Sequence, residues 1–121
     1  MSTKAVVSLV TGLEDTEKVT VALLVAVGAA ETGRPTLTFL TKEAVRLVQP
    51  GFAEGVGCDG CPPIAELMKR YEAAGGTFYA CPVCWNARHL QGSELIANAE
   101  IAGTVPMWEW IGDDGATTFS Y

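Results

Sequence analysis

Apolar residues in the first third of the chain are gathered in two runs that differ in length and kind. Residues 4–11 form a short β-branched run without strict alternation, which is typical of a strand buried on both faces. Residues 17–32 are apolar almost all the way round, and a helix without a polar face is buried on more than one side. In so small a domain, we expect the second side of this helix to contact another subunit.

The rest of the pattern predicts an alternation of strands and helices. We expect strands at residues 36–40 and 77–80, helices at residues 41–48 and 64–74 and from residue 82 onward, and a long loop at residues 49–61. Toward the C-terminus we expect a helix at residues 93–101, a strand at residues 104–111 and a last strand at residues 116–121 that pairs with it as a hairpin. The fold class is therefore α/β, a parallel sheet with helices on both faces, finished by one antiparallel strand.

The composition indicates one globular domain over residues 1–121. The chain has 121 residues, of which 49% are hydrophobic and 18% charged, so one real core can form but not two. Its net charge of -6 argues against nucleic acid or an anionic membrane as a partner. The longest apolar run, residues 19–30, is too short to span a bilayer, and the N-terminal pattern is not that of a signal peptide. We therefore expect a cytoplasmic protein without a membrane span.

Cys81 is the residue around which the chemistry of the chain is expected to gather. The β-prone run at residues 77–80 ends at this cysteine, and Pro82 suits the first turn of a helix because its missing N–H costs nothing there. The thiol would then stand between a strand end and a helix start, where the partial positive charge of the helix favours a thiolate. Since a thiolate attacks sulfur, carbon or metal, Cys81 is the leading candidate for a reactive residue.

The four cysteines form two C-x-x-C pairs, Cys58 with Cys61 and Cys81 with Cys84. In a parallel sheet, the helix after the first pair begins at the edge where the strand before the second pair ends, so we expect both pairs at that edge. By spacing alone they match a four-thiolate zinc site. Two other interpretations stay open: a thioredoxin-like dithiol, with a cis peptide bond before Pro106, and plain burial of small apolar side chains.

Several features resemble one family in their order and spacing. They are the opening strand, the long apolar helix, the strand from Gly75-Gly76 to Cys81, and the downstream Ala87-Arg88 and Leu90. In these features the chain resembles the DsrE/DsrF/TusD family (the DsrEFH-like, YchN-like group) from about residue 5 to residue 106. The resemblance implies a flavodoxin-like three-layer sandwich that assembles as a homo-oligomer, a trimer or a hexamer. It also implies a sulfur-relay protein without a cofactor, in which Cys81 carries sulfane sulfur as a persulfide from a donor protein to an acceptor protein.

Cys84 departs from the pattern of that family, whose cysteine usually lacks a close partner thiol. A neighbouring thiolate would attack a persulfide on Cys81, form a disulfide and release sulfide. We therefore interpret Cys81 and Cys84 as the catalytic pair of a sulfurtransferase-like protein with redox-active cysteines, and Cys58 and Cys61 as auxiliary thiols.

Two basic residues follow the second pair. Arg88 and His89 are candidates for orienting the thiolate. An arginine that only faces solvent is an equally common case, and a lone histidine is more often a surface or packing residue. The alternative for the whole chain is a structural or assembly module without catalysis, in which all four cysteines hold zinc.

Overall fold

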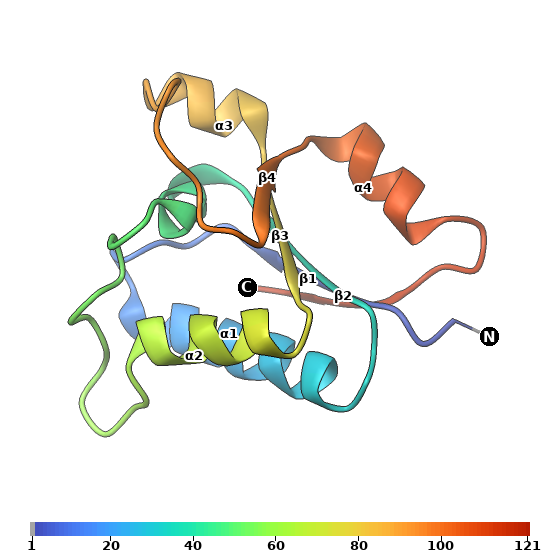
Figure 1. Cartoon of the computed structure of the whole chain (residues 1–121), viewed down its shortest axis with the longest axis horizontal. Helices are drawn as coiled ribbons and strands as arrows, with labels where there is room; N and C mark the ends of the chain where they lie inside the picture. Colours follow the sequence, from blue (N-terminus) through green and yellow to red (C-terminus); the bar gives the residue numbers. More distant parts are fainter. Residues whose placement is uncertain (1) are drawn as a thin grey trace.

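The computed structural model describes residues 2–121 and contains a five-stranded sheet in which every neighbouring pair of strands is parallel. The strand order is β4-β3-β2-β1-β5 (Figure 1). The strands are β1 (Ala5–Leu9), β2 (Thr36–Leu40), β3 (Thr77–Ala80), β4 (Ala99–Ile101) and β5 (Thr117–Ser120). The helices are α1 (Thr16–Glu31), the 3-10 helix η1 (Lys42–Val48), α2 (Ile64–Ala73), α3 (Pro82–Ala87) and α4 (Thr104–Ile111). The predicted α/β class is confirmed.

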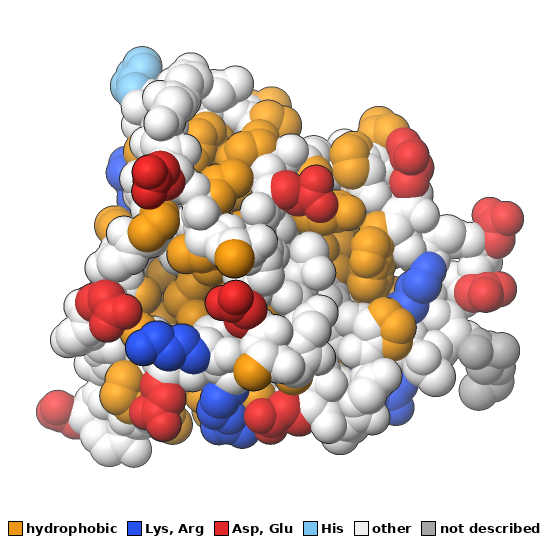
Figure 2. All heavy atoms as spheres, in the orientation of Figure 1, with side chains coloured by type: hydrophobic (Ala, Val, Ile, Leu, Met, Phe, Trp, Pro, Cys, Tyr) orange, Lys and Arg blue, Asp and Glu red, His pale blue; other side chains and the backbone are white. Residues whose placement is uncertain are grey.

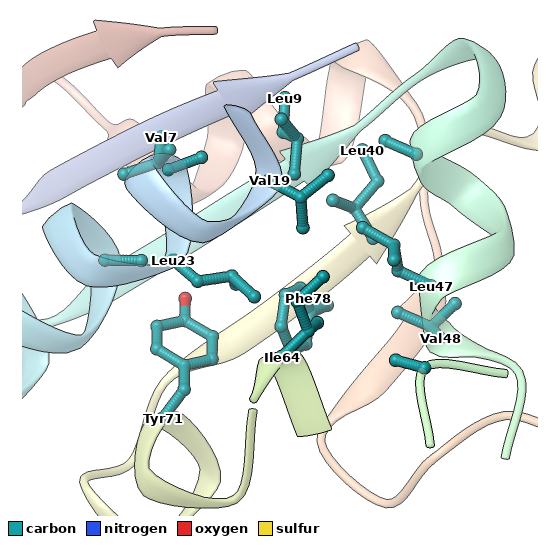
Figure 3. Packing of buried hydrophobic residues seen from close by; sticks show 14 of the residues in the cluster. Val7, Leu9, Val19, Leu23, Leu40, Leu47, Val48, Ile64, Tyr71 and Phe78 are labelled. Atoms are coloured by element: carbon teal, nitrogen blue, oxygen red, sulfur yellow. The ribbon is translucent and has the colours of Figure 1, made fainter. Parts of the chain in front are cut away.

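Helices cover both faces of the sheet, so the molecule has three layers. In Figure 1, α1 and α2 lie side by side on one face, and α4 lies on the other. Residues from β1, α1, β2, η1, α2 and β3 build the larger hydrophobic cluster, part of which is drawn in Figure 3. Successive strand residues face opposite sides, so Val6 and Leu37 belong instead to a smaller cluster with Ile111 of α4. Within the described residues, no helix is both long and apolar enough to cross a membrane.

Helix α1 is the long apolar helix that the pattern predicts. It starts after Asp15, whose side chain accepts a hydrogen bond of 3.0 Å from the Lys18 amide and so caps the helix. Val19, Leu23 and their neighbours on that side are fully buried against the sheet and α2. Val21 and Leu24 lie on the outer side and are exposed. The second, outer side of α1 therefore presents apolar side chains at the surface of the chain.

The helix predicted at residues 93–101 is wrong. The chain has no helix there, and only its last three residues are regular, as strand β4. Tertiary hydrogen bonds hold the stretch before β4 in an irregular path. The Ile96 amide donates to the Val48 carbonyl at 2.9 Å, and the Asn98 side chain donates to the Gly76 carbonyl at 2.9 Å. These contacts replace the helical turns that the local pattern favoured.

The predicted C-terminal hairpin is also wrong, since residues 104–111 form helix α4 and β5 runs parallel to β1. Trp108 and Trp110 stand two residues apart, which imitates the alternation of a strand. Met107, Trp110 and Ile111 instead follow helical spacing and pack onto the sheet, while Trp108 points away. Helix α4 is the crossover that a parallel β4–β5 connection requires, because parallel strands cannot be joined by a tight turn.

Tyr71 ties α2 to the sheet. Its ring is fully buried, and its hydroxyl accepts a hydrogen bond from the Thr38 hydroxyl at 3.0 Å and donates to the Thr77 carbonyl at 2.8 Å. Figure 3 shows the tyrosine with its hydroxyl directed into the core. A Cβ atom at residue 76 would lie 2.2 Å from this ring, so only glycine fits there. Gly76 thus sets the path by which the chain leaves α2 and enters β3.

We predict that Tyr71→Phe lowers the free energy of unfolding by about 1–3 kcal/mol, because it leaves the buried Thr38 hydroxyl without its acceptor. Removing both hydroxyls in Tyr71→Phe/Thr38→Val should cost less than the sum of the two single changes. Urea unfolding of the four chains measures this coupling. Strict additivity would contradict the buried hydrogen bond.

The raised pKa of buried Tyr71 leads us to predict a loss of stability in alkali. Burial raises the pKa of Tyr71 from 10.0 to about 12. When the pKa of a group is higher in the folded state than in the unfolded state, its contribution to stability is complete below the pKa of the unfolded state. That contribution is lost as the pH rises toward the pKa of the folded state. At about pH 11 the loss from this group should reach about 1.4 kcal/mol. The free energy of unfolding of Tyr71→Phe should therefore fall less steeply above pH 10 than that of wild type, and parallel curves would contradict the assignment.

Candidate functional site

Cys81 lies at the junction that the sequence predicted. It follows β3 directly, its amide donates to the Leu40 carbonyl of β2 at 2.9 Å, and its own carbonyl accepts from the Trp85 amide at 2.9 Å. The first hydrogen bond continues the sheet and the second opens α3, so the residue belongs to both elements. Its thiol is free and half-buried. Backbone position and exposure together place a reachable thiol at the carboxyl edge of an inner strand.

Cys84 stands one helical turn further on, inside α3. It is also a free, half-buried thiol, and it packs against the larger hydrophobic cluster. Between the two cysteines, Val83 is 74% exposed, so this side of α3 is open to solvent. Trp85 is buried and anchors α3 to the core. Helix α3 therefore presents two thiols within one turn on an anchored support.

Arg88 contacts η1 and the backbone of α3. Its Nε atom forms an ion pair with Glu43 Oε2, and its Nη1 atom donates to the Cys84 carbonyl at 3.2 Å. The second oxygen of Glu43 accepts from Arg46 Nε at 2.9 Å. The hydrogen bond from Arg88, with the one from Arg46, holds the pKa of the Glu43 carboxyl below its usual range. Arg88 therefore joins the backbone of α3 to Glu43 of η1, as a clamp between these two elements.

His89 follows α3 and is exposed at the rim of the molecule, where Figure 2 shows it in pale blue. Its backbone is in the left-handed region, with φ 56°, and its amide donates to the Asn86 carbonyl at 3.0 Å. This conformation ends α3 and turns the chain back toward buried Leu90. The geometry gives His89 a role at the end of the helix.

The other cysteine pair forms a disulfide, with a Cα–Cα distance of 5.2 Å between Cys58 and Cys61. It lies in the loop before α2, and α2 begins at the edge of the sheet where β3 ends, because it leads into β3 from there. Among residues 2–121, no three histidine, cysteine or acidic side chains gather closely enough to hold a metal ion. In the described part of the chain, the two cysteine pairs therefore do not form one cluster of potential ligands.

The cis peptide bond that a thioredoxin-like site would have near its dithiol does not occur. All peptide bonds among the described residues are trans, including the one before Pro106, which lies in the first turn of α4. Proline is well tolerated there because the first amides of a helix have no intrahelical acceptor. Pro106 therefore belongs to the start of a helix.

Parallel strands, helices on both faces and a free thiol at the end of an inner strand define a class of small α/β thiol proteins. The chain belongs to the DsrE/DsrF-like family, whose model matches residues 4–119. The resemblance read from the sequence is confirmed. Membership of this family suggests a role in sulfur relay, and the paired cysteines fit redox chemistry of thiols.

Solved structures share the fold over almost the whole chain. The ychN protein from E. coli aligns with a TM-score of 0.77 and 22% identity over 98% of this chain and 100% of that one. A protein of unknown function from Methanobacterium thermoautotrophicum, MTH1491, has a TM-score of 0.67 and 11% identity over 98% of both chains. BT1422 from Bacteroides thetaiotaomicron, also of unknown function, has a TM-score of 0.62 and 18% identity over 98% of this chain and 94% of that one. Among curated protein sequences, none matches the chain.

Glu43 is a site residue that the sequence did not reveal. It stands 45 positions before Arg88, and a single glutamate in a short helix has no distinguishing pattern. One available signal was the presence of Arg88 near the cysteines, because an arginine side chain often pairs with a carboxylate. Its role depends on tertiary contact alone.

We predict that Glu43→Gln makes Cys81 and Cys84 react faster with a neutral alkylating reagent, by about three-fold or more. The change removes the charge that Arg88 pairs with, so α3 should open more often. Glu72→Gln, which removes an exposed carboxylate on α2, serves as the matched control. Rates can be followed by mass spectrometry of the alkylated chain. Equal rates in both variants and wild type would contradict the clamp.

Proposed function

We propose that the protein carries sulfane sulfur as a persulfide on Cys81 and passes it to a partner. The observation that carries this proposal is a free, half-buried thiol at the junction of β3 and α3 in a chain of the DsrE/DsrF-like family. Both bonds that place Cys81 are made by its backbone, so its side chain is left for chemistry.

The transfer needs no cofactor and no net oxidation. The Cys81 thiolate attacks the outer sulfur of a donor persulfide, the S–S bond of the donor breaks, and the donor leaves as a thiolate. The outer sulfur then stays on Cys81. An acceptor thiolate attacks that outer sulfur in the same way, and Cys81 leaves as a thiolate. Sulfur is handed on while every other atom returns to its starting state.

Cys84 provides a second outcome for the bound sulfur. Its thiolate can attack the inner sulfur of the Cys81 persulfide, forming a Cys81–Cys84 disulfide and expelling hydrosulfide. The two cysteine thiols then lose two electrons in total, and the outer sulfur gains them. One turn of α3 separates the residues, and the clamp by Arg88 governs how far that turn can distort. Cys84 thus decides between passing sulfur on and releasing it as sulfide.

The surroundings of Cys81 suit contact with a protein donor or acceptor. The start of α4 lies beside the start of α3, since a Cβ atom at Gly103 would be 3.5 Å from Pro82. Val105 and Trp108 of α4 are 66% and 65% exposed, and Figure 2 shows hydrophobic side chains at the surface over this side of the molecule. Exposed apolar side chains of this kind favour docking of another protein.

We also propose that the chain forms a homo-oligomer, a trimer or a hexamer, through the apolar outer side of α1. Exposed Val21 and Leu24 support this, because a helix with apolar residues on both sides gains from covering the second one.

The proposal predicts the result of treating the anaerobic protein with inorganic polysulfide and weighing it by native mass spectrometry. Wild type should gain mass in steps of one sulfur atom on the Cys81 peptide. Cys81→Ser should gain none, and Cys84→Ser should gain sulfur and keep it longer, since no thiol expels it.

Cys58→Ser/Cys61→Ser is the matched control, because it removes two cysteines that lie elsewhere. It should take up sulfur as wild type does. The same spectra count the subunits. Uptake by Cys81→Ser equal to wild type would refute the carrier, and one tightly held zinc ion per chain, lost with any single cysteine, would favour a metal module instead.

A further inference from the structure

The Cys58–Cys61 disulfide takes no part in the proposed transfer at Cys81 and has no evident structural task. It lies in the loop between η1 and α2, which descends along the left of Figure 1, whereas α3 lies at the top. A disulfide either stabilises a fold or exchanges with other thiols, and the structure distinguishes these uses.

The disulfide contributes little to stability by restricting the unfolded chain. Its cysteines are three positions apart, and the stabilisation that a cross-link provides through chain entropy grows with the length of the loop it closes. It joins no two elements of secondary structure, since both cysteines stand in the same loop. A structural role therefore has a weaker basis here than for a cross-link that closes a long loop or joins two elements.

The turn is also held without the sulfur atoms. The Cys61 amide donates to the Cys58 carbonyl at 3.0 Å, and Gly60 has φ 77°, as the third residue of a type II turn requires. Around this turn, the Ile64 amide donates to the Val56 carbonyl at 3.1 Å and closes the base of the loop. The backbone therefore keeps the two cysteines adjacent whether or not they are bonded.

The two sulfur atoms have different surroundings. Cys58 Sγ lies 3.8 Å from Thr20 Oγ1, and Thr20, on α1, is only 2% exposed. The Thr20 hydroxyl donates to the Thr16 carbonyl, so its oxygen is an acceptor for a Cys58 thiol. Cys61 Sγ lies 3.8 Å from the Asp59 carbonyl, in an exposed contact within the loop. Both cysteines are half-buried, but the contact of Cys61 Sγ is exposed, whereas Cys58 Sγ has a partly buried polar neighbour that can accept a hydrogen bond from its reduced form.

We propose that Cys58 and Cys61 form a second redox site, a disulfide that exchanges with an external dithiol. A thiolate of the dithiol attacks Cys61 Sγ, the Cys58–Cys61 bond breaks, and Cys58 leaves as a thiolate that takes a proton from water. The second thiolate of the reductant then attacks the reductant's sulfur in the mixed disulfide with Cys61, and Cys61 leaves as a thiolate. The cysteine pair gains two electrons, and the dithiol loses two as it closes to its own disulfide.

The test uses the full chain carrying Cys81→Ser/Cys84→Ser, so that only the loop pair can react. The folded protein is treated with dithiothreitol, and the exposed thiols are counted by alkylation and mass spectrometry. We expect two alkylated cysteines without any denaturant, full return of the disulfide in air, and equal melting temperatures for the oxidised and reduced forms. A disulfide that opens only after unfolding, or a large fall in melting temperature on reduction, would overturn the proposal.

Single variants in the same background test which sulfur faces the reductant. Cys58→Ser leaves the Cys61 thiol, and Cys61→Ser leaves the Cys58 thiol. With oxidised glutathione as the probe, Cys61 should form the mixed disulfide about five-fold or more faster than Cys58. Equal rates, or faster reaction at Cys58, would contradict the assigned direction of attack. Because Cys81 is absent from every chain, the outcome is independent of whether the protein carries sulfur there.

Discussion

Every strand of this sheet points the same way, and that constraint shapes the rest of the molecule. Parallel neighbours cannot be joined by a turn, so each connection must cross a face of the sheet and return. All strands consequently end at one edge, which receives Cys81 from β3 and also holds the start of α2 after the loop with Cys58 and Cys61. The backbone bond from Cys81 to Leu40 is the last rung of the ladder that creates this edge.

The clamp between Arg88 and Glu43 connects this edge to the reactivity of its thiols. Helix α3 has only six residues, too few for a stable helix on its own, so its geometry depends on what it touches. Buried Trp85 holds it on the core side, and the ion pair holds it against η1. The aromatic anchor and the charge pair thus add to the backbone bonds of Cys81 in holding α3, which carries Cys84, in place.

The sequence was informative where local pattern and tertiary structure agree. Strands β1, β2 and β3 and helices α1 and α2 have clear apolar runs with glycine, proline or capping residues at their ends, and they lie where the pattern placed them. Strand β5 also lies where a last strand was predicted, but the elements at residues 93–111 and the direction of β5 were predicted wrongly, because contacts far along the sequence decide them. The Ile96 amide finds its acceptor at Val48, and the two tryptophans of α4 imitate a strand while their helix packs on the sheet.

In the site, Pro82 revealed the junction at Cys81, whereas Glu43 and the Cys58–Cys61 bond depended on distances that spacing does not encode.

The pairing of β1 with β5 has a consequence for how the sheet assembles. Ala5 lies opposite Thr117, so this ladder closes almost the entire chain into a loop, while β1–β2 and β2–β3 join segments that are much closer along the sequence. The chain entropy lost on closing a loop rises with its length, so the three inner strands form a folding nucleus more readily than the outer pair. All four residues of β5 are exposed, and little apolar area is lost when it detaches. We therefore expect the pairing of β5 with β1 to form last and to break first. Strand β3, which ends at Cys81, belongs to the inner part of the sheet, which we expect to form early and to stay paired.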